Sequence, residues 1–241
     1  MTDRHIPNDL DVQADAIAAA TVHSIRPELD RGERTVKEGV LRMGVLVEDQ
    51  ILAALDALVR HDAERALRVI QDDRRINEAQ FELSSQIAGV IATQQPVARD
   101  LRFLLSLDHV SYELERMGDH AASVAKQARK LAPYPPLGPY EGLPEMARLV
   151  ASLVRGILGA LVDIDEQAAR AVAARDDDVD ELYHRTFDDT LALMRADPDN
   201  VDPGTRVLFA AHYLERIGDR VTNIAEDIVF LATSQIVDLN P

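Results

Sequence analysis

Two pairs of carboxylate side chains are the residues in this sequence with the clearest capacity for chemistry. Glu115 and Asp119 lie four residues apart, and so do Glu215 and Asp219. On a helix, residues at this spacing share one face, with their Cβ atoms about 5 to 6 Å apart. Like charges so placed destabilise an isolated helix, and a bound cation reverses the sign of that effect. The spacing therefore indicates two candidate cation sites.

Each pair has a polar partner pair on the segment that precedes it. Asp73 and Asn77 precede the first pair, and Asp176 and Asp180 precede the second. In an antiparallel helical hairpin, the two pairs of one half can face each other. Three or four carboxylates that converge from two helices suit a hard cation, as in bundle proteins that hold two iron or two manganese ions. Iron, manganese or magnesium is thus a better match than zinc.

The second candidate site has the richer set of oxygen donors. Asn223 and Glu226 continue its acidic stripe at helical spacing and are candidate additional ligands. In the first half Ser123 and Lys126 take these places, and Asn77 replaces a carboxylate. Because oxygen sites tune their affinity for hard cations largely through ligand charge, we expect the first site to bind metal more weakly.

A solvated surface is the alternative explanation for each pair, because charged residues make up 28% of the sequence. Repetition argues against it, since the string Glu-Arg-aliphatic-Gly-Asp occurs twice, each time with an acidic partner upstream. Gly118 and Gly218 inside these strings each cost about 1 kcal/mol relative to Ala in a helix interior. A close approach of two helices, or room for an ion, accounts for them. His184 and His212 are weaker candidate ligands, and we expect His120 to face away.

Sequence signatures of enzymes are absent around these residues. The sequence has no nucleophile elbow, phosphate-cradling glycine loop, dinucleotide fingerprint or zinc-protease motif. We also expect no clear Glu-x-x-His motif, the ligand pattern of ferritin-like oxidases, on any helix. Since there is no Cys, disulfides, thiolate metal ligands and Cys nucleophiles are excluded. We therefore predict that the protein is not an enzyme, with a carboxylate-bridged, ferritin-like metalloenzyme as the alternative.

Helices are the elements that must position these residues. Hydrophobic residues make up 46% of the sequence and aromatic residues only 4%, which is typical of a helical bundle. Apolar residues of the first helix recur every three or four positions, at Val40, Met43, Val47, Ile51, Ala54, Leu55 and Leu58. Inward positions of the second helix include Leu67, Ile70, Phe81, Ile87 and Val90. The predicted helices span about 25–59, 63–92, 96–131, 143–164, 166–194 and 205–233.

Prolines mark the boundaries between these helices. Gln95-Pro96 ends the second helix, because the residue before a proline avoids the helical conformation. Residues 133–139 hold four prolines, which no helix tolerates. At the start of the third helix, Arg99, Asp100 and Arg102 are expected to make local caps and ion pairs. The predicted organisation is an extension at 1–24, a first three-helix unit at 25–132, a linker at 133–142 and a second unit at 143–241.

The second unit repeats the first. An offset of 103 residues places Asp62 on Asp165 and Asp73 on Asp176, and an offset of 100 places the string Glu115–Asp119 on Glu215–Asp219. The change of offset falls between the second and third helices, where insertions cost little. The sequence therefore predicts an all-α fold of two tandem three-helix bundles related by internal duplication.

Charge excludes several kinds of partner. The net charge is −16, and no run of Lys or Arg is available to follow a phosphate backbone, so nucleic acid is excluded as a partner. The same charge disfavours anionic membrane surfaces, and no uncharged apolar stretch is long enough for insertion into a bilayer. The first residues lack the basic and apolar regions of a secretory signal, which predicts a cytoplasmic location.

Three strings in the sequence resemble the PhoU family of phosphate-transport regulators, and the resemblance extends from about residue 28 to the end. They are residues 95–102 (QPVARDLR), 115–119 (ERMGD) and 214–226 (LERIGDRVTNIAE). The resemblance implies a homodimer of paired three-helix bundles. It also implies a cytoplasmic adaptor between the phosphate ABC transporter ATPase and a sensor histidine kinase, which restrains phosphate uptake and keeps the phosphate-starvation regulon off when phosphate is ample.

Some members of that family hold multinuclear iron or zinc clusters on their acidic pairs, which implies such a cluster here, with iron as the first candidate. The matching positions are Asp73, Asn77, Glu115, Asp119, Asp176, Asp180, Glu215 and Asp219. Asn77 departs from an all-carboxylate pattern. An accessory subunit of a different phosphate permease is a further alternative function.

Overall fold

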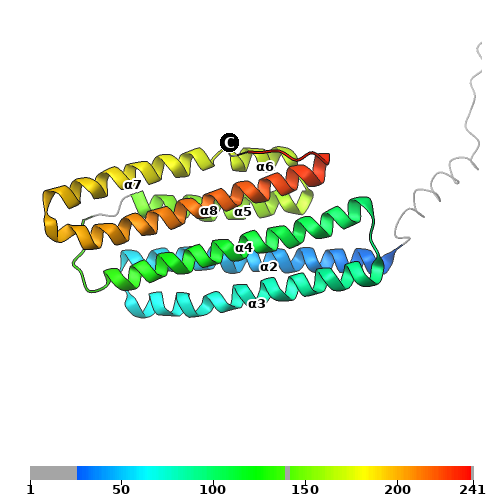
Figure 1. Cartoon of the computed structure of the whole chain (residues 1–241), viewed down its shortest axis with the longest axis horizontal. Coiled ribbons are helices and arrows are strands. Elements are labelled where there is room, and N and C mark those ends of the chain that lie inside the picture. The colour runs from blue at the N-terminus through cyan, green and yellow to red at the C-terminus, as the bar shows by residue number, and fades with distance from the viewer. Residues whose placement is uncertain (1–25, 139–141, 240–241) are drawn as a thin grey trace, which may run out of the picture.

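The computed structural model describes residues 26–138 and 142–239, and every regular element in these ranges is helical (Figure 1). The helices of the first half are α2 Pro27–Val59, α3 Ala63–Gln94 and α4 Ala98–Leu131. Those of the second half are α5 Gly142–Asp163, α6 Glu166–Ala173, α7 Asp176–Ala196, the 3₁₀ turn η1 Pro198–Asn200 and α8 Val201–Thr233. The predicted all-helical, duplicated fold is thus confirmed. The predicted extension at 1–24 lies outside the described residues.

The two halves enter their second helix through the same turn. Asp62 caps α3 by accepting a hydrogen bond from the backbone N–H of Arg65 at 2.8 Å. Asp165 caps α6 in the same way, with the N–H of Ala168 at 3.0 Å. The residue before each cap has a left-handed backbone, with φ of 53° before Asp62 and 52° before Asp165. Each cap contributes about 1 kcal/mol, and the repeat in the sequence is therefore also a repeat in local structure.

The predicted single helix over 166–194 is wrong, because the chain divides it into α6 and α7 at Ala174 and Arg175. Asp176, Asp177 and Asp178 form the first turn of α7. Negative side chains are stabilised at a helix N-terminus, where the macrodipole is positive. Three consecutive Asp residues therefore favour a new helix start over a continuous helix, and this signal is visible in the sequence.

The last helix begins earlier than predicted, at Val201 rather than at residue 205. Pro203 and Gly204 lie buried in its first turn. A proline is tolerated there because the N–H that it lacks has no partner within the helix. The separating segment is therefore shorter than expected and consists of Asp197 and the η1 turn.

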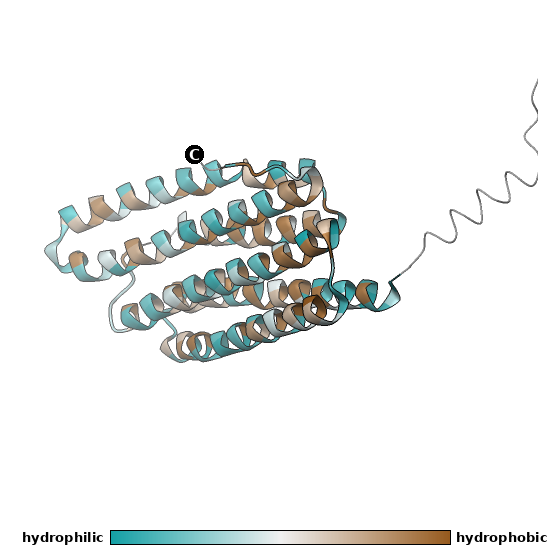
Figure 2. Cartoon of the chain, turned by 45° about the vertical axis from the view of Figure 1, so that its right-hand side comes forward, coloured by the Kyte–Doolittle hydropathy of each residue, from teal (hydrophilic) through white to brown (hydrophobic). Residues whose placement is uncertain are grey.

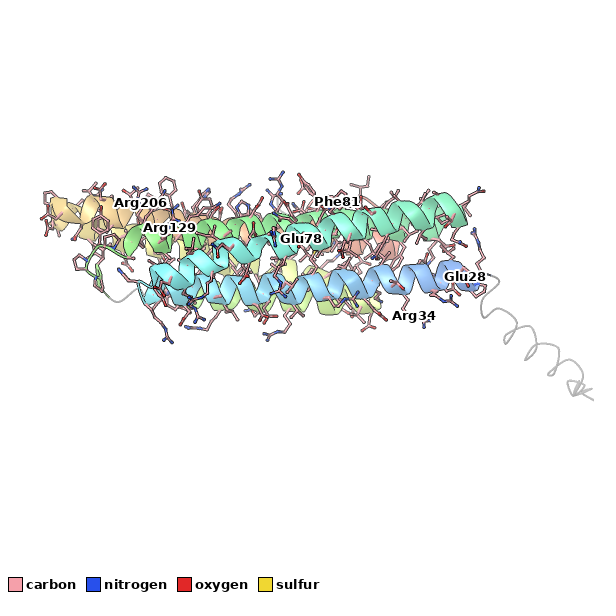
Figure 3. The ribbon with its side chains drawn as sticks, turned by 90° about the horizontal axis from the view of Figure 1, so that it is seen from below. Glu28, Arg34, Glu78, Phe81, Arg129 and Arg206 are labelled. Carbon is pink, nitrogen blue, oxygen red and sulfur yellow. The ribbon has the colours of Figure 1, made fainter. Side chains whose placement is uncertain are left out.

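Burial follows the predicted apolar pattern in α2 but not throughout α3. All seven predicted inward positions of α2 are buried. In α3, Ile87 is buried, whereas Leu67 is 40% exposed and Phe81, labelled in Figure 3, is 72% exposed. The prediction was wrong there because α3 is an outer helix with a narrow buried face. No helix in the described ranges is long and apolar enough to cross a membrane.

The two units lie side by side, with α2, α4, α5 and α8 between α3 on one side and α6 and α7 on the other (Figure 1). Helix α4 packs against α8, and α2 packs against α5. Nδ1 of His109 lies 2.7 Å from Oδ2 of Asp227, and Oε2 of Glu113 lies 3.4 Å from Nη1 of Arg220, so α4 and α8 run antiparallel. The helices turn apolar faces inward (Figure 2), and both units share one hydrophobic core.

Candidate metal centre

The four carboxylates predicted in the second unit lie on two helices that pack against each other, α7 and α8. Asp176 and Asp180 lie on α7, and Glu215 and Asp219 lie on α8. Burial, and next the charge of Asp219, raise the pKa of the other three carboxyl groups, to about 7 for Glu215 and about 6 for Asp176. We call these four residues the second acidic set. The charge of Asp219 thus acts on each of the other three carboxyl groups.

Glycine allows this close approach. A Cβ atom on Gly218 would lie 2.4 Å from Oδ1 of Asp176. At Gly118 the same atom would lie 3.0 Å from Cδ1 of Ile76 and 3.3 Å from Oδ1 of Asp73. At both glycines, side chains of the neighbouring helix, including an Asp of the acidic set, occupy the space that a Cβ atom would need, and the contact is tighter in the second unit.

Two oxygen atoms of the second acidic set are buried without a hydrogen-bond donor among the described residues. They are Oδ1 of Asp176 and Oε2 of Glu215. The other oxygen of Asp176 accepts only a long bond of 3.4 Å from the hydroxyl of Thr222. Nδ1 of His212 lies 3.5 Å from Oε2 of Glu215, which is too far for a good hydrogen bond. A hard cation would supply the positive charge that these oxygens lack.

The arginines of the two repeated strings behave differently. Nη1 of Arg216 lies 2.6 Å from Oδ2 of Asp219 and so neutralises one carboxylate of the second acidic set. Arg116 covers the ring of Tyr112, with its guanidinium carbon 5.0 Å from the ring centre, and donates hydrogen bonds to the Tyr112 hydroxyl. Its Nε atom also lies 3.9 Å from Oε2 of Glu115, which is a long ion pair. Neither arginine neutralises both carboxylates of its pair.

The corresponding residues of the first unit, Asp73, Asn77, Glu115 and Asp119, form the first acidic set. Oδ1 of Asp73 accepts a hydrogen bond from Nε2 of Gln50 on α2 at 3.0 Å. Burial raises the pKa of Asp73, while the Gln50 bond, the charge of Lys126 and the amide of Asn77 lower it. Groups of the protein itself therefore satisfy part of the first acidic set.

Two sequence differences between the units explain this contrast. The repeat places buried Leu153 where α2 has Gln50, and Glu226 where α4 has Lys126. The second acidic set therefore lacks both the amide donor and the cation of the first. Lys126 was part of the sequence prediction, but Gln50 was missed because it lies on a third helix. The available signal in the sequence was that Gln50 is a polar residue on the otherwise apolar face of the helix predicted over 25–59.

Both candidate additional ligands are engaged elsewhere. Nδ2 of Asn223 donates a hydrogen bond to Oε2 of Glu113 on α4 at 3.2 Å. Oε1 of Glu226 accepts one from the backbone N–H of Leu239 at 2.9 Å. The stripe that the sequence predicted along α8 is therefore divided between the acidic set, the contact with the first unit and the chain after α8.

The three histidines lie near α8 with different surroundings. His184 lies near Asp180. Burial, and next the charge of Asp219, raise the pKa of Asp180, and His184 lowers it. His120 stacks on Tyr213 across the two units, with ring centres 6.0 Å apart. Burial, and next the charge of Arg220, lower the pKa of His120 to about 4, so this ring is neutral at physiological pH.

The expectation that no helix carries a Glu-x-x-His motif is wrong, because one such string lies on α7, at Glu181 and His184. Ferritin-like sites use one such motif on each of two helices. Glu181 lines a hollow with Arg148 of α5, on a different side of α7 from the second acidic set. The ligand arrangement of a ferritin-like enzyme is therefore not reproduced.

The donors of the second acidic set fit a hard cation in type, charge and unsatisfied oxygen atoms. In residues 26–138 and 142–239, however, no three His, Asp or Glu side chains are arranged to hold one ion. Metal binding would therefore require these side chains to change rotamer, while the helices keep their positions.

Glu215→Gln is expected to flatten the pH dependence of stability of the metal-free protein. Folding raises the pKa of Glu215 from 4.5 to about 7, so the folded state binds more protons than the unfolded state between these values. The stability from this group is fully present below about pH 4.5 and is lost as the pH rises to about 7. Above that pH the variant should be more stable than the parent by on the order of 1 kcal/mol.

Urea unfolding of parent and variant across this pH range measures the effect. Glu82→Gln, at an exposed position of α3, is the control and should leave the pH dependence unchanged. If Glu215→Gln matches the parent at every pH, the electrostatic description of the second acidic set is wrong.

Comparison with known proteins gives a consistent match along the chain. The sequence profile of the PhoU domain matches residues 40–128 and 143–228, which lie in the two units. The phosphate-specific transport system accessory protein PhoU homolog of Clostridium acetobutylicum is 39% identical over 202 residues, covering 83% of this chain and 92% of that protein. The homolog from Xylella fastidiosa is 36% identical and covers 88% of both chains.

Two solved structures share the fold. The crystal structure of PhoU from Pseudomonas aeruginosa superimposes with a TM-score of 0.82 at 30% identity, covering 86% of this chain and 100% of that chain. The phosphate transport system regulatory protein PhoU from Streptococcus pneumoniae gives a TM-score of 0.82 at 31% identity, covering 88% and 100%. The helices and their packing are therefore those of solved PhoU structures.

Proposed function

Because this chain belongs to the PhoU family, we propose that it restrains phosphate uptake and keeps phosphate-starvation genes off when phosphate is ample. The supporting observation is that the match includes both units and the full length of two solved PhoU chains. The quoted relatives are named accessory or regulatory proteins of phosphate transport, and not enzymes. A match of this extent supports the same non-enzymatic role here.

The proposed mechanism is that of a cytoplasmic homodimeric adaptor between the phosphate ABC transporter ATPase and a sensor histidine kinase. An adaptor without catalysis shifts a partner between conformations only by binding one of them more tightly. The net charge of −16 makes basic surfaces of the two partners the suitable docking sites. Complementary charge of this kind mainly increases the association rate and the specificity.

The isolated transporter ATPase and the cytoplasmic part of the kinase should therefore each bind this protein in a salt-dependent manner. We expect Kd to rise roughly tenfold between about 0.05 M and about 0.5 M salt, because salt screens the attraction between opposite surface charges. Surface plasmon resonance measures it, with an unrelated acidic helical protein as the control. Absence of binding to both partners at low salt would contradict the adaptor role.

We further propose that the second acidic set holds a multinuclear metal site, with iron as the first candidate and manganese, magnesium or zinc as the others. The unsatisfied oxygens of Asp176 and Glu215 support this assignment. The first acidic set, with Gln50 and Lys126 beside it, is proposed to bind metal more weakly. Metal bound to the second acidic set would stabilise the folded state, since the unfolded chain lacks the site.

A further inference from the structure

A cavity with a volume of about 360 Å³ lies at the end of the molecule where α2 and α4 begin and α8 ends. Figure 1 shows these helix ends together, on the right. Apolar walls come from both units, namely Phe103 of α4, Ile164 after α5 and Leu231 of α8. The volume is within the range of small-ligand pockets. The cavity has no residue in common with either acidic set.

Three cations and three carboxylates line this cavity, and two of the cations make no direct ion pair or hydrogen bond with another described residue. In the described residues, the guanidinium groups of Arg99 and Arg102 make no ion pair and no hydrogen bond, and Nε of Arg102 is buried without an acceptor. The ion pairs predicted from the sequence for these arginines are therefore not formed. Lys37 donates to the carbonyl oxygen of Val162. The unpaired donors indicate a place for an anion.

The start of α4 adds to this positive potential. Val97, at the N-cap position, provides no side-chain hydrogen bond to the first turn. The helix has 34 residues, and its macrodipole places partial positive charge beside Arg99, although Asp100 also lies in this first turn. Together with the arginines, this helix end makes the cavity suited to an oxyanion.

Packing alone does not require these cations. The repeat offset of 100 places Asp199 and Asp202 at the positions of Arg99 and Arg102. Those aspartates line a cavity at the opposite end of the molecule, where the chain after α4 meets η1, and no Lys or Arg lines it. The equivalent positions of the second unit therefore carry the opposite charge. Since the fold does not require cations at these positions, a binding role for the two arginines is favoured.

Glu33 restricts which oxyanion fits. Its Oε1 atom is buried without a hydrogen-bond donor in the described part of the chain. Burial, then the charges of Asp100 and Asp30, raise the pKa of Glu33 to about 7, while Arg99 lowers it. A carboxylate beside a bound oxyanion is repulsive unless one proton lies between them. The ligand must therefore carry that proton whenever Glu33 is ionised.

We propose that this cavity binds inorganic hydrogen phosphate, with Arg99 and Arg102 donating hydrogen bonds to its oxygens and the Glu33 carboxylate accepting a hydrogen bond from its P–OH group. Hydrogen phosphate keeps one proton throughout the neutral and mildly alkaline range. Sulfate has none, and a phosphate monoester loses its last proton above about pH 6. The arrangement therefore selects inorganic phosphate over both. The proposal goes beyond the regulatory role, because it makes this chain itself a phosphate receptor.

Isothermal titration of the metal-free, full-length protein with sodium phosphate, sodium sulfate and glycerol phosphate tests the proposal. At a pH about one unit above the Glu33 pKa of about 7, phosphate should bind at least about tenfold more tightly than the other two anions. About one unit below that pKa, protonated Glu33 can donate to sulfate, and the preference should shrink. Equal binding of phosphate and sulfate at the higher pH would overturn the proposal.

Two variants and one control locate the site. Arg102→Gln should weaken phosphate binding at least about tenfold. Glu33→Gln should abolish the preference for phosphate over sulfate, because an amide can both accept from phosphate and donate to sulfate. Asp202→Asn, at the repeat-equivalent position, should change neither. Phosphate binding that survives Arg102→Gln, or no phosphate binding at all, would overturn the assignment. Because titration measures binding alone, either result would leave the regulatory role in cells untouched.

Discussion

Deletion of the gene for this protein is expected to switch on phosphate-starvation genes in phosphate-rich medium and to leave phosphate uptake poorly restrained. An adaptor that binds the non-signalling state of the kinase more tightly holds its partner there, and removal of the adaptor releases the kinase. A preference of about 100-fold, roughly 2.7 kcal/mol, is enough to change a mostly silent pathway into a mostly active one. A starvation-promoter reporter and uptake of labelled phosphate measure the two effects.

Complementation provides the controls for this experiment. The intact gene should restore silence of the reporter at high phosphate, whereas an empty vector should not. A strain that expresses the protein with Glu215→Ala and Asp219→Ala separates the metal from the regulatory role. If the reporter stays silent in the deletion strain at high phosphate, the regulator assignment is wrong, whatever metal the purified protein holds.

Most of the fold could be predicted because local signals and the repeat agree. The apolar residues of α2 recur at helical spacing, and Asp62 and Asp165 cap equivalent helices. The division of α6 from α7 was missed because the apolar pattern continues across Ala174, whereas the three Asp residues that begin α7 act through the helix dipole. The antiparallel packing of α4 on α8 depends on long-range contacts, which spacing along one chain does not reveal.

The sequence predicted which residues form the candidate site, but not which of them other groups of the protein neutralise or hydrogen-bond. Spacing and repetition placed Glu215 and Asp219 opposite Asp176 and Asp180, because the period of a helix fixes which side chains share a face. The role of Gln50 could not be predicted, since it depends on how α2 lies against α3. Nor could spacing show that Asn223 is bonded to the first unit instead of facing the acidic set.

Glu215→Ala combined with Asp219→Ala is expected to remove the more tightly bound metal and to leave the helical content largely intact. The variant deletes two of the four carboxylates of the second acidic set, and loss of ligand charge lowers the affinity of an oxygen site for hard cations by orders of magnitude. The helices are stabilised mainly by apolar residues such as Leu214 and Ile217, which stay buried. Elemental analysis after purification without added metal, together with circular dichroism, measures both results.

The matched control is Glu115→Ala with Asp119→Ala, which makes the same change in the first acidic set. Because Gln50 and Lys126 already compensate Asp73, that variant should lose less metal and should leave the tighter binding phase of a titration in place. Equal metal content in the second-set variant and the parent would exclude the second acidic set as the metal site. Equal losses from the two variants would show that the amide of Gln50 and the charge of Lys126 do not set the affinity.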